Sequence, residues 1–210
     1  MTIELIVGDC VAVTYSLHDA SIDLTVTSPP YDALRSYTRE GDWTFAKFEQ
    51  LAKELYRVTE TGGVVMWNVA DQTIKGSESG SSFKQALFFM QCGFKLADTM
   101  IYKKANSGGA RGSNKAYTQA FEYMFVLSKG SMKTVNLIKD RPNKRVGEVA
   151  KAGGGRTKAG LIRATREIIT AAFGKRSNIW TYATQQDAWS KKHPAAMPLD
   201  VPLRISSTRS

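Results

Sequence analysis

The chain has 210 residues, 42% of them hydrophobic, which suits one substantial globular domain. No stretch approaches the roughly 18 consecutive apolar residues of a membrane-spanning helix, and the amino terminus lacks the regions of a signal peptide. With two cysteines and two histidines, we expect a cytoplasmic protein that has neither a disulfide framework nor a bound metal. The net charge of +10 favours a polyanionic partner such as nucleic acid, but a generic basic protein has the same excess.

The sequence of residues 3–58 predicts two strands and two helices. Residues 3–7 predict a short buried strand stopped by a Gly-Asp pair, and residues 10–17 predict a helix. Residues 22–26 predict a second strand. Apolar residues at three- and four-residue intervals then predict an amphipathic helix over residues 45–58.

The middle of the chain predicts a strand over residues 64–69 and a helix over residues 83–91. Residues 95–103 and 120–128 predict two strands that pair as a hairpin around the intervening loop. Strands that alternate with helices are typical of an α/β fold, so we expect a mostly parallel sheet with helices on both faces.

The composition changes after Gly130. Residues 139–176 contain eleven Lys and Arg residues but only three acidic residues. Most of the excess positive charge therefore lies in one insertion. The apolar spacing predicts a short helix within residues 161–172, and we expect the rest of the insertion to become ordered on binding.

The second predicted strand ends in Thr27-Ser28-Pro29-Pro30-Tyr31, a sequence suited to chemistry on an exocyclic amine. Two prolines fix their φ angles and remove two backbone N–H groups, so nearby carbonyls can accept hydrogen bonds from an incoming donor. Tyr31 offers a flat face for a base. The alternative is a Pro-Pro turn such as can follow any buried strand.

This sequence resembles motif IV of the amino-methylating DNA methyltransferases. Residues 26–31 have the form associated with N4-cytosine enzymes, whereas N6-adenine enzymes more often begin the motif with an acidic residue. Gly8-Asp9-Cys10 resembles the family's strand end that reaches the adenosine of S-adenosylmethionine, and Asp9 has the alternative role of capping the next helix. Residues 62–71 and 121–126 resemble two further strands of the family. Asn178-Ile179-Trp180 followed by His193-Pro194-Ala195 resembles its motif X, which flanks the methionine part of the cofactor.

The resemblance implies an incomplete Rossmann-like methyltransferase sheet with helices on both faces and a basic DNA-recognition insertion. It assigns residues 1–130 to the catalytic half of the domain, 131–177 to target recognition and 178–210 to a return segment toward the cofactor site. The implied cofactor is S-adenosylmethionine and the implied partner is double-stranded DNA. The expected catalytic residues are Ser28, Pro29, Pro30 and Tyr31; the expected cofactor contacts are Asp9, Cys10, Ser28, His193 and Pro194; the expected DNA contacts are Arg35, Arg111, Lys144, Arg145, Arg156 and Lys158.

The order of these motifs is that of the permuted class, in which the glycine-rich cofactor motif comes last. An aromatic-acidic-Gly-x-Gly segment is expected after Ala195, and the sequence to Ser210 does not contain one. We therefore expect a truncated product or one part of a split enzyme, in which a second chain completes the sheet. A catalytically inert DNA-binding protein is the alternative. The recognition sequence and the methylated base, cytosine or adenine, stay open.

Overall fold

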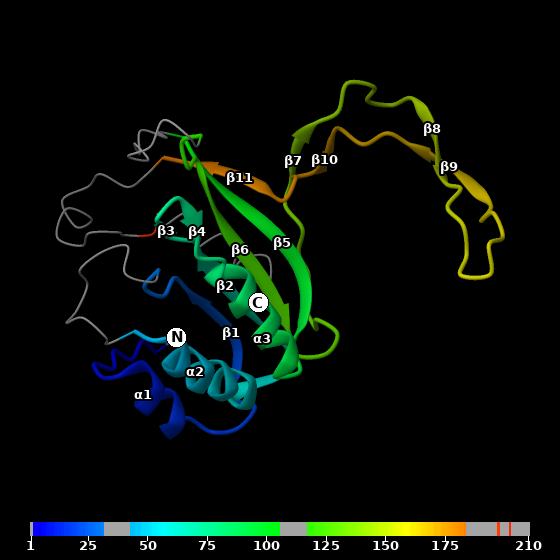
Figure 1. Ribbon diagram of the computed structural model, residues 1–210. Coiled ribbons are helices and arrows are strands. Elements are labelled where there is room, and N and C mark those ends of the chain that lie inside the picture. The colour runs from blue at the N-terminus through cyan, green and yellow to red at the C-terminus, as the bar shows by residue number, and fades with distance from the viewer. Residues whose placement is uncertain (1, 32–42, 106–116, 184–196, 198–201, 203–210) are drawn as a thin grey trace. The chain divides into compact units, whose positions relative to one another are not determined.

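A computed structural model describes residues 2–31, 43–105, 117–183, 197 and 202 (Figure 1). The chain divides into two compact units. The first unit contains residues 1–136 and 178–210, and the second contains Leu137–Ser177.

Three helices of the first unit follow the apolar spacing of the sequence and confirm the three helices predicted for it: α1 (Cys10–Ser16), α2 (Phe45–Val58) and α3 (Ser81–Gln91). Thr44 caps α2, because its side chain accepts a hydrogen bond from the Lys47 amide. The stripe that α2 buries is Phe48, Leu51, Ala52, Leu55 and Val58.

Five of the described strands form the main sheet in the order β1 (Ile22–Thr27), β2 (Thr59–Val69), β6 (Phe121–Ser128), β5 (Lys95–Lys104) and β11 (Ile179–Tyr182). The predicted hairpin is confirmed, since β5 and β6 pair antiparallel. The β1–β2 and β5–β11 pairs are parallel, but β2 and β6 are antiparallel. The sheet is therefore mixed rather than mostly parallel, because hairpin strand β6 lies between β2 and β5.

A small hairpin precedes α3. It joins β3 (Thr73–Ile74) to β4 (Ser77–Glu78) through Lys75 and Gly76, which both have positive φ. This conformation matches the primed turns that connect two-residue hairpins. Asp71 then accepts hydrogen bonds from the Ser82 amide and the Ser81 hydroxyl, so it caps the beginning of α3.

Helices α2 and α3 pack on the same face of the sheet. Trp67 of β2 lies between Phe48 of α2 and Phe89 of α3, with ring centroids 5.7 and 5.1 Å away. The Trp67 ring nitrogen donates to Gln85 at 2.8 Å, which satisfies its buried N–H. Side chains on the other face of the same strands are also buried, including Met66 and Met124.

The strand predicted over residues 3–7 is wrong. These residues have no regular secondary structure, and Val7 is fully exposed. A strand needs a neighbour to pair its backbone groups, and no described strand lies beside this segment. The helix that follows is nevertheless fixed to α2, because the Arg57 guanidinium donates to the carbonyls of Thr14 and Leu17 at 2.9 Å.

The second unit is a two-stranded ribbon. Its base pairs β7 (Lys139–Pro142) with β10 (Phe173–Lys175), and farther along β8 (Val149–Gly153) pairs with β9 (Thr165–Ile169). The helix predicted within residues 161–172 is therefore wrong. Thr165, Ile168 and Ile169 are β-branched, and they extend in β9 opposite a complementary strand.

Candidate functional site

The proline motif lies at the carboxyl end of β1, where the chain leaves the sheet. Thr27 is the last residue of the strand and pairs in parallel register with Trp67 of β2. Pro29 is buried, while Ser28, Pro30 and Tyr31 are partly exposed. The carboxyl ends of parallel strands are the usual place for ligand sites in α/β sheets.

The Tyr31 hydroxyl is the centre of a polar network. It lies 2.8 Å from Ser28 Oγ and donates to Glu122 Oε2 at 2.7 Å. The Asn68 amide nitrogen donates to the same tyrosine oxygen and to Glu122 Oε2, both at 2.6 Å. Lys104 Nζ lies 2.8 Å from Glu122 Oε1 and balances the carboxylate charge.

The direction of each hydrogen bond in this network follows from its chemistry. An ionised carboxylate only accepts, so Tyr31 uses its single proton on Glu122. Ser28 must then donate its own proton to Tyr31. As a result, the lone pairs of Ser28 Oγ are not used on Tyr31.

Reasoning from the sequence missed Glu122, Asn68 and Lys104. Glu122 is 91 positions from Tyr31 in the chain, so no local spacing indicated the contact. The available signal was a polar residue inside an otherwise apolar run, Asn68 within residues 64–69 of β2 and Glu122 within residues 121–127 of β6. Asn68 is only 2% exposed, which such a residue tolerates only when it has partners.

Two polar atoms near this network are buried without a hydrogen-bond partner among the described residues. They are Asn68 Oδ1 and the Tyr102 hydroxyl. Tyr102 is the cross-strand partner of Glu122. Burial, assisted by the Glu122 charge, raises the pKa of Tyr102 to about 12, so this phenol is neutral at physiological pH.

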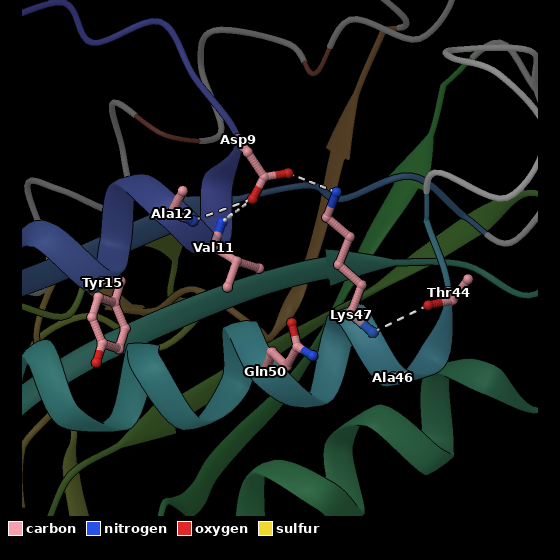
Figure 2. Close-up of a pocket in the computed structure, with 8 residues that line it drawn as sticks. All are labelled: Asp9, Val11, Ala12, Tyr15, Thr44, Ala46, Lys47 and Gln50. Carbon is pink, nitrogen blue, oxygen red and sulfur yellow. Dashed lines mark hydrogen bonds and ion pairs between the residues drawn. The ribbon is translucent and has the colours of Figure 1, made fainter.

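Asp9 lies beside an open groove of about 540 Å³ between α1 and α2 (Figure 2). Its Oδ1 accepts from the Val11 and Ala12 amides, and its Oδ2 lies 2.6 Å from Lys47 Nζ. The hydrogen bond from Lys47, together with that from Ala12, lowers the pKa of Asp9 below its ordinary value. The capping role is therefore present, and it leaves an ionised carboxylate at the groove.

Cys10 is exposed, but its thiol is not activated. Partial desolvation, reinforced by the negative charge of Asp9, raises the pKa of the thiol. A thiol with a raised pKa carries little thiolate at neutral pH, and thiolate is the nucleophilic form. Among the described residues no group of three or more His, Cys, Asp or Glu side chains is placed to hold a metal ion.

The residues predicted to contact DNA separate into two groups. Lys144, Arg145, Arg156 and Lys158 are all exposed in the second unit. Arg35 and Arg111, together with the cofactor candidates His193 and Pro194, lie outside the described residues.

No described helix is long and apolar enough to cross a membrane.

Residues 22–207 match a family of N6 and N4 methyltransferases described as DNA methylase. The chain belongs to this DNA methylase family. It is 48% identical over 190 residues to the orphan methyltransferase M.BamHII of Bacillus amyloliquefaciens, an alignment that covers 87% of this chain and 69% of M.BamHII. The recognition made from the motifs is thus confirmed, and the family consists of enzymes that use S-adenosylmethionine.

The fold is shared with solved structures, two of which are compared next. The cytosine-N4-specific PvuII DNA methyltransferase superposes with a TM-score of 0.62 at 15% identity, covering 97% of this chain and 69% of that one. The complex of M1.HpyAVI with SAM has a TM-score of 0.56 at 16% identity, covering 95% and 72%. Identities this low establish only the shared α/β methyltransferase fold, which confirms the predicted fold class.

Proposed function

We propose that this protein transfers a methyl group from S-adenosylmethionine to an exocyclic amine of a flipped base in double-stranded DNA. N4 of cytosine is the favoured acceptor, because the motif begins with Ser28, and N6 of adenine is next. The single observation that carries the proposal is the network of Ser28, Tyr31, Asn68 and Glu122 at the end of β1. Membership of the DNA methylase family supports the reaction type.

The network suits an amine that is a weak nucleophile, because its lone pair is delocalised into the base. Ser28 Oγ, which donates to Tyr31, accepts one N–H of the amine, and the Pro29 carbonyl accepts the other. These two bonds favour a pyramidal nitrogen whose lone pair points away from the base. The Tyr31 ring, held by its hydroxyl, provides the stacking surface for the flipped base.

The donor set partly fits the cofactor. When bound, S-adenosylmethionine supplies an electrophilic methyl on a cationic sulfur: the new N–C bond forms as the S–C bond breaks, and the amine then loses a proton. The ionised Asp9 carboxylate suits the hydroxyl and amino donors of the adenosine, and the adjacent groove has a volume in the usual range for ligand sites. Cys10, His193 and Pro194 stay proposed contacts.

Nucleoside analysis tests this function. DNA is incubated with the purified protein and S-adenosylmethionine, hydrolysed, and examined by mass spectrometry. We expect little product from the chain alone, N4-methylcytosine when the wild-type chain is assembled with the part of M.BamHII that it does not match, and none when Ser28→Ala is assembled in the same way. N6-methyladenine in place of N4-methylcytosine would correct the base and keep the reaction. Folded protein that yields neither base, even when assembled with the part of M.BamHII that this chain does not match, would contradict the proposal.

A second candidate is an inert DNA-binding protein, or one part of a split enzyme. The observation that favours it is that β1 has β2 as its only neighbour among the described strands, which leaves one edge of β1 unpaired there. Calorimetric titration with S-adenosylmethionine separates the candidates. An enzyme binds the cofactor, an inert module does not, and one part of a split enzyme binds it only after its partner is added.

A further inference from the structure

The ribbon of the second unit has almost no interior. All five residues of β9 are exposed, and in β8 only Ala150 and Ala152 are partly covered. A two-stranded ribbon of this kind is at best marginally stable alone in water. Backbone hydrogen bonds nevertheless join its two strands along their length. At the base the Arg176 amide donates to the Ile138 carbonyl, and at the tip (residues 156–163) the Thr157 amide donates to the Leu161 carbonyl.

Its charge indicates the class of partner. Eleven Lys and Arg residues face three acids, an excess of eight positive charges in 41 residues. Two of the three acids already have a cationic partner. Arg176 Nε donates to Asp140 Oδ2 at 3.0 Å, and Arg145 Nε lies 3.9 Å from Glu148 Oε2. The uncompensated charge complements the phosphates of nucleic acid.

The tip carries a feature that phosphate binding does not explain. Leu161 and Ile162 are 69% and 76% exposed, although they are large apolar side chains. They follow a tight turn in which the Gly160 amide donates to the Thr157 carbonyl at 2.9 Å. Arg163 follows them directly, and Arg156 lies opposite Ile162 across the ribbon.

Backbone geometry fixes this tip. Gly153 has a φ of +103°, and a Cβ at this position would lie 2.8 Å from the Ala164 carbonyl oxygen. Only glycine fits there without displacing the opposite strand. The Arg163 amide then donates to the Gly155 carbonyl at 2.8 Å. Leu161 and Ile162 are therefore held beyond the paired strands β8 and β9, which form the shaft of the ribbon.

The dimensions and chemistry of the ribbon match the major groove of DNA. Paired strands lie about 4.8 Å apart, and the groove, about 12 Å wide, admits a two-stranded ribbon. The apolar group displayed by base pairs in that groove is the C5-methyl of thymine. We propose that the ribbon tip enters the major groove of duplex DNA, where Leu161 and Ile162 contact thymine methyl groups and flanking cations contact phosphates.

This inference rests on the proposed function for the identity of the polyanion. It adds to that function a sequence-reading element with a stated target. Arg156 and Arg163 lie beside the apolar pair and are suited to the phosphates on either side of the groove. The tip would thus favour sites that contain thymine independently of the chemistry at Ser28.

Replacement of thymine by uracil tests the contact, because it removes the methyl group and keeps the pairing and the charge. Duplexes enriched from a random pool by the full wild-type chain are synthesised with either base. Wild-type protein should bind the thymine form about fourfold more tightly for each contacted methyl group. Leu161→Ala/Ile162→Ala should bind both forms equally and with weakened affinity.

Val149→Ala/Ile169→Ala is the matched control. Its residues are 64% and 74% exposed in the shaft of the same ribbon, so it removes a similar apolar area and should keep the thymine preference. Four outcomes would overturn the inference: no enriched duplex, no thymine preference in the wild type, an unchanged preference in the tip variant, or sedimentation showing that the tip joins two copies of the chain. If the wild type transfers methyl groups but Leu161→Ala/Ile162→Ala keeps the preference for thymine over uracil, only the inference is rejected. If that preference depends on the tip as expected but no methyl group is transferred, only the proposed function is rejected.

Discussion

At the residue scale, the hydroxyl of Tyr31 determines what Ser28 can do. Ser28 donates to Tyr31 because Tyr31 donates to Glu122, and in the proposed reaction the serine lone pairs accept an N–H of the amine. The tyrosine ring is proposed to stack on the base and its hydroxyl to orient Ser28, so substitutions can separate the two roles.

Tyr31→Phe keeps the ring and removes the hydroxyl that orders Ser28. Hydrogen bonds to charged groups contribute about 1.5–3 kcal/mol, so we expect methyl transfer to fall about tenfold or more while DNA affinity stays within about twofold. Single-turnover rates and DNA titrations measure the two quantities. A parallel decrease in DNA affinity would show that Tyr31 acts mainly in binding.

Glu122→Gln keeps the size of the side chain and removes the charge that fixes the network. The variant should lose methyl transfer about as strongly as Tyr31→Phe, and the double variant should lose little more, because both changes release the same serine. Lys103→Met is the control. Lys103 is an exposed cation beside Lys104 in β5, but Lys103 itself is outside the network. Fully additive losses would mean that Glu122 and Tyr31 act independently.

Asp9 gives a pH prediction. Its pKa is lowered below the ordinary 3.8 by the hydrogen bonds from Lys47 and the α1 amides. A lowered folded-state pKa contributes stability that is present above pH 3.8 and is lost as the pH falls through the folded value. Lys47→Met should raise the Asp9 pKa, measured by NMR titration of the carboxyl, but leave it below 3.8 because the backbone donors remain. An unchanged pKa would remove the assigned role of Lys47.

At the element scale, apolar periodicity was sufficient for α2, α3 and the β5–β6 hairpin, because each buries one face against the core. It failed where pairing partners decide the structure. Residues 3–7 are apolar but have no described neighbour, and residues 161–172 have helix-like spacing but extend along β8. The candidate residues Ser28 and Tyr31 were selected from local sequence, whereas Asn68, Lys104 and Glu122 join the same network only through the order of the strands.

The ribbon predicts a salt-dependent contribution to DNA binding. Changing Lys144, Arg145, Arg156 and Lys158 to Ala should reduce the slope of log affinity against log salt by about 0.9 for each phosphate that the protein no longer neutralises. Lys84→Ala/Lys95→Ala is the control, because it removes exposed charges from the first unit. If the control lowers the slope equally for each charge removed, the ribbon is not a preferred DNA-binding surface.

At the scale of the whole molecule, the apolar core and the exposed basic ribbon lie in different units. The apolar core cluster lies in the first unit, between α2, α3 and the main sheet, while the ribbon residues are almost all exposed. Replacing residues 137–177 with a short glycine-serine loop should therefore leave the melting temperature of the first unit unchanged within a few degrees. The same variant should lose most of its DNA affinity, and unfolding on removal of the ribbon would show that the units depend on each other.

Methyl transfer from labelled S-adenosylmethionine, measured together with DNA affinity for the wild type and Ser28→Ala, is the most direct test of the proposed reaction. The assay is run on the chain alone and on the chain assembled with the part of M.BamHII that it does not match. We predict little turnover by the chain alone, transfer to cytosine N4 in the assembly, and a large decrease of that transfer in Ser28→Ala with unchanged DNA affinity. Equal turnover by Ser28→Ala and the wild type would contradict the role assigned to the proline motif.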